Sequence, residues 1–326
     1  MDFLNQLVSD VNGVLWGVFF LIPLLCGTGI FYTIKLRFVQ VRKFGLAARF
    51  LLGGASLFGK RADKSGMSSF QALATAVAAQ VGTGNVAGTA TALVAGGPGS
   101  LFWLWVAAFF GMATIFAEAV LAQTYRTKDE QGRVLGGPAY YITLGMGEKW
   151  RPLAVFFSIA IIIALGCIGN MVQSNSIAVA FQNAFGIPSL YTGLFVAGFA
   201  AFIFFGGLGR IASTTEKIVP VMAFLYILGS LIVILSNYEQ IIPAFKMIFV
   251  GAFNPQAATG GVIGATIKEA MRYGVARGLF SNEAGSGSAP CAAATAETPH
   301  PARVGLTQAF GVFIDTLLCT CTAMVM

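Results

Sequence analysis

Charged residues are scarce in this sequence. Aspartate, glutamate, lysine and arginine together make up 10% of its 326 residues, whereas hydrophobic residues make up 56%. A soluble domain carries about 25% charged residues, which it needs to cover its surface. This scarcity excludes a soluble protein of this length. It also excludes a basic soluble face for nucleic acid, so we expect no nucleic-acid partner.

The residues that build metal centres and disulfide frameworks are also few. The sequence holds one histidine, His300, and its five cysteines form no CxxC pair. Four of these cysteines lie in apolar sequence, which is typical of buried thiols. The motifs HExxH and GxxxxGK[ST] do not occur, so a zinc protease and coupling to ATP are excluded. We therefore predict no enzyme, no transition-metal site and no resident cofactor.

Long runs without a charged residue decide the class of protein. These runs cover residues 11–34, 65–117, 152–209 and 218–238. A membrane-spanning helix needs roughly 20 apolar residues, and the second and third runs are long enough for two helices each. Backbone N–H and C=O groups find no water partner in lipid, so such runs must be helical. The sequence predicts an all-α polytopic membrane protein with a single transmembrane domain over residues 1–326.

Basic residues predict the orientation in the membrane. Residues 35–64 hold eight lysines and arginines against one acidic residue, Asp63. The excess of positive charge in cytoplasmic loops places this loop inside and the N-terminus outside. We expect about eight helices, and a C-terminally truncated chain, because the last helix ends without a polar tail. The expected helices cover residues 11–34, 67–94, 100–124, 152–185, 190–207, 218–236, 261–296 and 303–326.

The second expected helix contains a polar, glycine-rich interruption. Its centre reads Gly82-Thr83-Gly84-Asn85, and each glycine weakens a helix by about 1 kcal/mol. Non-helical backbone at membrane depth survives only when it is buried in protein or lines a cavity. A break there frees N–H groups that suit a carboxylate and carbonyl groups that suit a cation. The alternative is that small residues here allow close helix packing.

The seventh expected helix repeats this chemistry. Its middle reads Ser281-Asn282-Glu283 followed by Gly285-Ser286-Gly287-Ser288. Two interrupted segments in corresponding positions of two halves are the best sequence indication of a transporter binding site. The first interrupted helix runs from inside to outside and the second runs from outside to inside. We therefore expect an extra helix over 11–35, a five-helix repeat over 66–236, and the start of an inverted second repeat over 261–326.

Several motifs resemble the alanine/glycine:cation symporter family, the amino acid carrier proteins. They are GTGNVAG at 82–88, GGPG at 96–99, GGP at 136–138, GNMVQ at 169–173 and GLFSNEAGSGSAP at 278–290. The resemblance covers essentially the whole chain. The first motif also looks like the broken first helix of the neurotransmitter:sodium symporters. That likeness implies the five-plus-five inverted-repeat symporter fold with one extra N-terminal helix.

The resemblance implies a function and a location. It implies sodium-coupled symport of alanine or glycine across the cytoplasmic (inner) membrane by alternating access. Na⁺ would be the co-transported ion, and ATP would take no part. A proton-coupled or differently specific amino-acid transporter, or a non-transporting fragment of one, remains the alternative. An ion channel would favour a continuous polar stripe, whereas this sequence shows two local interruptions.

The interruptions and the resemblance together give the expected site residues. Substrate contacts are expected from Gln80, Thr83, Gly84, Asn85, Gln173, Phe280, Ser281 and Asn282. Ion contacts are expected from Val81, Gly82, Asn85 and Ser286. For Gln173 the alternative is hydrogen bonding between helices, and for Phe280 it is apolar packing.

Three acidic residues are interpreted as gating or structural charges: Glu118, Glu283 and Asp315. We expect Glu118 to accept hydrogen bonds from the freed N–H groups of the helix over 67–94, with a charge at the membrane edge as the alternative. Asp315 falls in the middle of the last expected helix. A charge there costs at least about 2.5 kcal/mol unless it is paired, and the sequence does not identify its partner.

Overall fold

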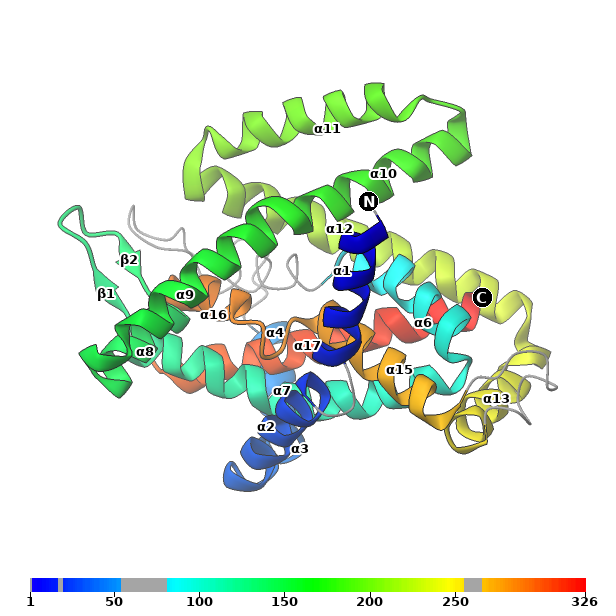
Figure 1. The fold of residues 1–326 in the computed structure, drawn as a ribbon, viewed down its shortest axis with the longest axis horizontal. Helices are drawn as coiled ribbons and strands as arrows, with labels where there is room; N and C mark the ends of the chain where they lie inside the picture. The colour runs from blue at the N-terminus through cyan, green and yellow to red at the C-terminus, as the bar shows by residue number, and fades with distance from the viewer. Residues whose placement is uncertain (1, 17–19, 54–80, 255–265) are drawn as a thin grey trace.

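The computed structural model describes residues 2–16, 20–53, 81–254 and 266–326. Two long helices, α7 (Gly99–Thr124) and α17 (Pro301–Val325), pack against each other through the centre of the molecule (Figure 1). Helix α15 (Ile267–Asn282) also packs on α7. The remaining central elements are η1 (Gly84–Gly88), α6 (Thr89–Gly96), α13 (Ile241–Phe253) and α16 (Ser288–Ala294).

Small and branched apolar side chains fill the space between α7 and α17. Ala108, Met112 and Ile115 of α7 form one buried cluster with Ala309 and Val312 of α17. Small residues at such contacts let helix backbones approach closely, which is how helices associate in lipid. The central pair of helices is therefore a tightly packed support for the segments beside it.

Glycines of α15 allow its close approach to α7. A Cβ atom at Gly274 would lie 2.2 Å from the backbone carbonyl oxygen of Ser100 and 2.8 Å from the Cβ of Trp103. A Cβ atom at Gly278 would lie 3.2 Å from the Cγ of Leu104. The approach of α15 to α7 thus depends on the absence of a side chain at Gly274.

Local signals explain where the central helices begin. Thr266 and Glu269 form a reciprocal capping box that starts α15. Pro301 occupies the first turn of α17, and the Nδ1 atom of His300 accepts a hydrogen bond of 3.1 Å from the N–H of Ala302. The first part of the helix expected over 261–296, residues 261–265, lies outside the described residues.

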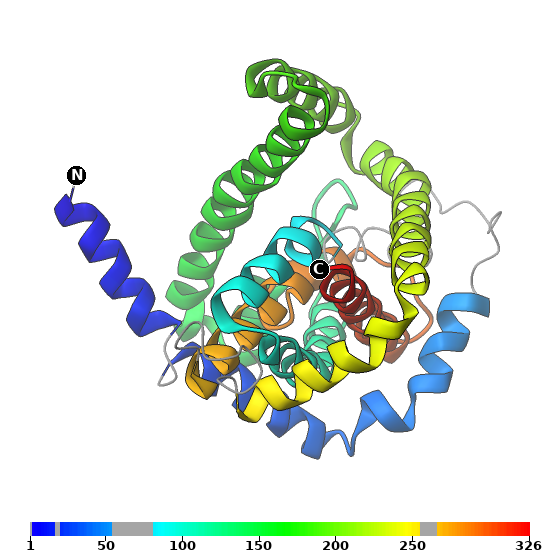
Figure 2. The same ribbon diagram turned by 90° about the vertical axis from the view of Figure 1, so that its right-hand side faces the viewer.

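A second group of helices stands beside the central ones. Figure 2 shows α10, α11 and α12 arranged as an arch around the central helices. Helices α9 and α10 continue through the π-helix η3 into one helical stretch of 38 residues, Glu148–Phe185. The elements of this group are α8 (Pro138–Met146), η2 (Glu148–Trp150), α9 (Arg151–Ile161), η3 (Ile162–Gly169), α10 (Asn170–Phe185), α11 (Ser189–Phe204), α12 (Gly207–Ser236) and η4 (Tyr238–Gln240).

The described part of the chain contains four helices that are long and apolar enough to cross a membrane. They are Gly99–Thr124, Glu148–Phe185, Gly209–Ser236 and Pro301–Val325. In the first and the last of these helices, 56% of the most apolar stretch is buried inside the molecule. In the other two helices, only 6% and 11% of that stretch is buried. Large exposed apolar surface of this kind marks a contact with a membrane or with another protein segment. The predicted class, an all-α integral membrane protein, is confirmed.

Two expected boundaries differ from the structure. Helix α12 begins at Gly207, so the predicted start of this helix at residue 218 is wrong. Within the first turn of α12, the guanidinium of Arg210 donates a 2.9 Å hydrogen bond to the Phe202 carbonyl of α11 and lies over the Phe202 ring, which gives this charge partners inside the helical region. At the N-terminus, α1 (Asp2–Leu15) begins before residue 11, and α2 (Leu21–Lys35) follows with residues 17–19 undescribed.

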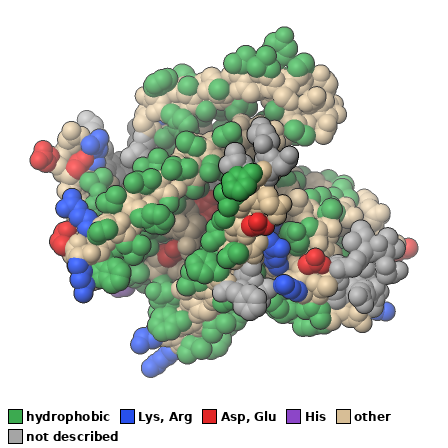
Figure 3. Space-filling model, in the orientation of Figure 1, with side chains coloured by type: hydrophobic (Ala, Val, Ile, Leu, Met, Phe, Trp, Pro, Cys, Tyr) green, Lys and Arg blue, Asp and Glu red, His purple; other side chains and the backbone are tan. Residues whose placement is uncertain are grey.

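Several charged side chains lie around a hairpin at one end of the molecule, and others lie elsewhere on the same face (Figure 3). This end carries a two-stranded antiparallel hairpin, β1 (Thr127–Lys128) and β2 (Val134–Leu135), and Figure 3 shows charges clustered there. In the hairpin, Arg133 donates a 2.7 Å hydrogen bond to Asp129, and this contact holds the pKa of the Asp129 carboxyl below its usual range. Two short helices near the N-terminus complete the fold, α3 (Val39–Arg42) and α4 (Phe44–Gly53).

Candidate functional site

The backbone departs from an α-helix at the first predicted interruption. Residues Val81 and Gly82 are non-helical, and residues Gly84–Gly88 form the π-helix η1. The Oδ1 atom of Asn85 accepts a 2.8 Å hydrogen bond from the N–H of Gly82. The side chain of Asn85 therefore satisfies one of the freed backbone donors. Gln80, a predicted substrate contact, lies outside the described residues.

The second predicted interruption separates α15 from α16. Glu283, Gly285 and Gly287 have φ angles of +54°, +89° and +82°, in the region that favours glycine. The Oδ1 atom of Asn282 accepts a 3.0 Å hydrogen bond from the N–H of Ala284 and stabilises this turn. The helix stops at Asn282 and restarts at Ser288, as the polar, glycine-rich sequence predicts.

A buried cluster connects the two interruptions through α17. The Oδ1 atom of Asp315 accepts hydrogen bonds of 2.6 Å from the Nδ2 atom of Asn85 and 2.7 Å from the hydroxyl of Ser281. The exposed fractions of Asn85, Ser281 and Asp315 are 2%, 3% and 0%. We call these three residues the Asp315 cluster. It supplies the partners of Asp315 that the sequence does not identify.

Cys319 also lies in this region. The sequence predicts it only as a buried thiol and does not place it near the site. Its Sγ atom lies 3.4 Å from the Ser281 hydroxyl and 3.5 Å from the Nδ2 atom of Asn85. On an α-helix, residues four apart lie on the same face, so Cys319 follows Asp315 by one turn. That spacing is the signal that could have placed it beside the site.

Other predicted substrate residues meet beside the Asp315 cluster. A Cβ atom at Gly84 would lie 3.2 Å from the Cα of Ser281 and 3.6 Å from the Cδ1 of Phe280. From α10, the Oε1 atom of Gln173 accepts a 3.3 Å hydrogen bond from the N–H of Thr83. Residues that are far apart in the sequence are thus brought together around the first interruption.

The predicted partner of Glu118 is wrong. Its Oε2 atom accepts a 3.1 Å hydrogen bond from the N–H of Gly285, at the second interruption and not in the helix over 67–94. The reason is that α7 packs against α16 and the end of α15, where Gly285 exposes its N–H. Beside it, the carboxylate of Glu283 accepts a hydrogen bond from Ser288, and the hydroxyls of Ser286 and Ser288 lie 2.7 Å apart.

The contact between Glu118 and Gly285 gives a testable prediction. Replacing Glu118 with alanine removes the acceptor of the Gly285 N–H, and a hydrogen bond of this kind contributes about 0.5–1.5 kcal/mol to stability. We expect Glu118→Ala to lower the melting temperature of the purified protein and its rate of alanine counterflow. The control is Glu118→Gln, whose amide oxygen can still accept from Gly285. Equal losses in both variants would show that the charge, and not the hydrogen bond, matters.

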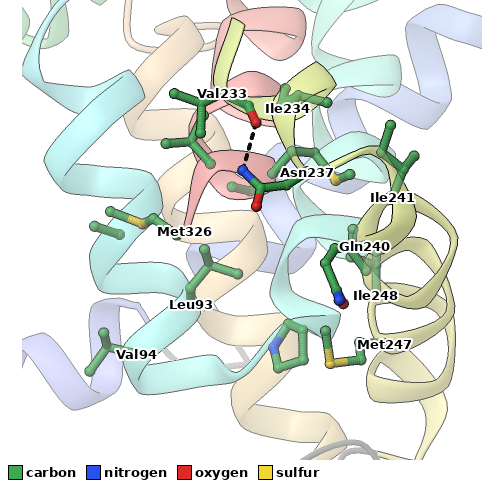
Figure 4. A pocket seen from close by; sticks show the side chains of 16 residues that line it. Leu93, Val94, Val233, Ile234, Asn237, Gln240, Ile241, Met247, Ile248 and Met326 are labelled. Carbon is green, nitrogen blue, oxygen red and sulfur yellow. Dashed lines mark hydrogen bonds between the residues drawn. The ribbon is translucent and has the colours of Figure 1, made fainter. Parts of the chain in front are cut away.

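Two cavities lie near these elements. One of about 660 Å³ is lined by α6, α12, α13 and the end of α17, and Figure 4 shows mainly apolar side chains around it. It contains none of the predicted site residues. The other, of about 340 Å³, lies between Trp16, which follows α1, and Arg272, Arg277 and Phe280 of α15. Phe280 thus has one side on this cavity and another near Gly84.

The fold and the polar interruptions define an all-α membrane transporter, and comparison with known proteins gives its family. The model of the sodium:alanine symporter family matches residues 1–326. The chain belongs to this family, a family of transporters and not of enzymes. The resemblance found in the sequence motifs is therefore confirmed.

Characterised and uncharacterised relatives support this assignment. The sodium/alanine symporter AgcS of Methanococcus maripaludis is 47% identical over 332 residues, which cover 100% of this chain and 71% of that protein. An uncharacterized transporter of Haemophilus influenzae is 45% identical over 328 residues, covering 99% of this chain and 70% of the relative. A probable sodium/glutamine symporter of Bacillus subtilis is 45% identical over 323 residues, covering 99% and 65%.

Proposed function

We propose that this protein couples the movement of Na⁺ to that of alanine or glycine by alternating access. The observation that carries this proposal is the meeting of two interrupted helices at one buried polar cluster. Asn85 comes from the first interrupted helix and Ser281 from the end of α15, and both donate to Asp315. Interrupted helices that meet at mid-membrane are the usual site of substrate and ion in secondary transporters.

The surroundings of Gly84 favour a small substrate. The close approach of Ser281 and Phe280 leaves little room for a side chain at Gly84, and this crowding favours a compact ligand. We propose that the backbone of residues 82–85 binds the substrate carboxylate. Gln173 reaches the same segment from α10 and is proposed to bind the amino group. Phe280 forms the apolar wall, while Thr83 and Asn282 complete the proposed contacts.

The orientation and the repeat are proposed on charge and helix order. The basic stretch after α2 and the charged hairpin favour the cytoplasmic side of the cytoplasmic membrane, with the N-terminus outside. The first interrupted helix and α15–α16 are proposed to be inverted counterparts. Val81, Gly82 and Ser286 are proposed ion contacts in these two segments.

Counterflow in proteoliposomes tests the function. Vesicles loaded with unlabelled alanine should accumulate labelled alanine when Na⁺ is present and should not when choline replaces it. Glycine should compete, whereas glutamine, named for one relative, should compete less because the space at Gly84 is small. Counterflow that needs a proton gradient and ignores Na⁺ would contradict sodium coupling and favour the proton-coupled alternative.

A further inference from the structure

The smaller of the two cavities carries an excess of positive charge. It has a volume of about 340 Å³, and Arg272 and Arg277 of α15, both partly buried, line it. Neither arginine takes part in the two ion pairs found among the described residues. A cleft lined by charge of one sign attracts ions of the opposite sign. The cavity is therefore suited to an anionic group.

The two arginines are held differently. The Cζ atom of Arg272 lies 5.7 Å from the centre of the Tyr273 ring, a cation–π contact that orients this guanidinium. The guanidinium of Arg277 forms no hydrogen bond or ion pair with the described residues. A guanidinium carries five N–H donors in a planar fork, which matches the two oxygens of a carboxylate. Arg277 therefore has its donors available for a carboxylate in the cavity.

Polar and aromatic side chains complete the lining. Asn12 and Trp16 lie one turn apart, and the N–H of Trp16 donates a 2.9 Å hydrogen bond to the Asn12 carbonyl. Tyr273 and Phe280 of α15 line the same cavity. The faces of aromatic rings attract ammonium groups. Together with the arginines, they offer partners for both charged ends of a zwitterionic amino acid, in a volume typical of small-molecule sites, which hold about 300–1,000 Å³.

Phe280 borders both this cavity and the first interruption. A Cβ atom at Gly84 would lie 3.6 Å from the Cδ1 atom of Phe280, and the same side chain lines the cavity. In the orientation proposed above, α1 and the beginning of α15 lie toward the outside. The cavity is then on the outer side of Phe280, and the proposed substrate segment, residues 82–85, lies beyond it.

We propose that this cavity is an outer capture site, in which Arg277 binds the carboxylate of the amino acid before the amino acid passes Phe280. Arg272 adds to the positive charge that attracts the carboxylate, and the rings of Trp16 and Tyr273 receive the ammonium group. This proposal rests on the amino-acid transport proposed above. It adds a second site, outside the proposed contacts of residues 82–85.

Tryptophan fluorescence of the purified protein tests binding separately from transport. Alanine is added in detergent without Na⁺, and potassium chloride keeps the ionic strength constant. We expect alanine to change the fluorescence, and alaninamide, which lacks the carboxylate, to have no such effect at the same concentrations. The change should disappear in Trp16→Phe, which assigns the signal to this cavity. An equal response to alaninamide would contradict recognition of the carboxylate.

The deciding variant is Arg277→Gln, which keeps a polar side chain and removes the charge. We expect the alanine concentration for half-maximal fluorescence change to rise by at least about tenfold, because hydrogen bonds to charged groups are the stronger ones. The matched control is Lys268→Gln, which removes the same charge from an exposed position of α15 that does not line the cavity. This control should keep the alanine response of the unmodified protein.

Counterflow separates capture from a purely structural role of Arg277. In Arg277→Gln, the alanine concentration for half-maximal counterflow should rise, whereas the maximal rate should stay that of the unmodified protein, because the proposed contacts at residues 82–85 are unchanged. A lower maximal rate with an unchanged half-maximal concentration would show a structural role and overturn the capture site.

A second variant keeps the test valid if Arg277→Gln does not fold. Arg272→Gln should raise the half-maximal alanine concentration by a smaller factor. An alanine response equal to that of the unmodified protein in either folded variant, or no response that depends on Trp16, would overturn the capture site. An alanine response that depends on Arg277, together with no Na⁺-dependent counterflow, would instead contradict the proposed function alone.

Discussion

Replacement of Gly84 with valine is expected to reduce alanine counterflow by at least about 100-fold, the effect of misplacing a site by about 1 Å. Even the first carbon of a side chain at this position would lie 3.2 Å from the Cα of Ser281 and 3.5 Å from its hydroxyl. Valine adds two methyl groups to that contact. Helix α15 must then move away from the π-helix η1, which pulls Ser281 from Asp315.

Gly88 provides the matched control for this prediction. It belongs to the same π-helix and is also buried, yet a Cβ atom there would meet nothing within 4 Å among the described residues. We expect Gly88→Ala to retain most of the counterflow activity, with the amount of protein in the vesicles measured for both variants. Transport by Gly84→Val at the rate of Gly88→Ala would show that η1 does not need to contact α15.

Replacement of Gly274 with alanine is expected to cause the largest loss of stability. The new Cβ would lie 2.2 Å from the backbone carbonyl oxygen of Ser100, and backbone cannot rotate away as a flexible side chain can. Overpacking of this kind typically costs about 1–3 kcal/mol, and more where backbone must shift. Thermal unfolding monitored by tryptophan fluorescence should show a lower melting temperature for Gly274→Ala.

The control for Gly274 should shift stability in the opposite direction. Gly193 lies within α11, and a Cβ atom there would meet nothing within 4 Å. Alanine favours a helix over glycine by about 1 kcal/mol, so Gly193→Ala should keep or raise the melting temperature. If both substitutions lower it equally, the contact between α15 and α7 is not what limits stability.

The class and the two interruptions could be predicted from the sequence because their signals are local. Charge-free runs identify helices in lipid, and clustered glycines with polar neighbours identify places where a helix fails. The turn at Glu283, Gly285 and Gly287 follows directly from residues that favour positive φ angles. The inverted-repeat relation between the interruptions stays a prediction.

The partners across the fold could not be predicted in the same way. Glu118 contacts Gly285, and Asp315 contacts Asn85, because of how α7, α15 and α17 pack against one another. No periodicity within one helix carries that information. Hydropathy also misplaced the start of α12, because the partner of Arg210, the Phe202 carbonyl, lies on the preceding helix α11.

The side-chain amide of Asn85 links two parts of the fold, the backbone at the first interruption and the carboxylate on α17. Its oxygen holds the N–H of Gly82, and its nitrogen holds the carboxylate of Asp315. Rotation of this one planar group would exchange donor and acceptor at both ends at once. The backbone at the first interruption and the carboxylate on α17 therefore depend on the orientation of the same side chain. We expect a change at either place to reach the other through this one side chain, because Asn85 contacts both directly.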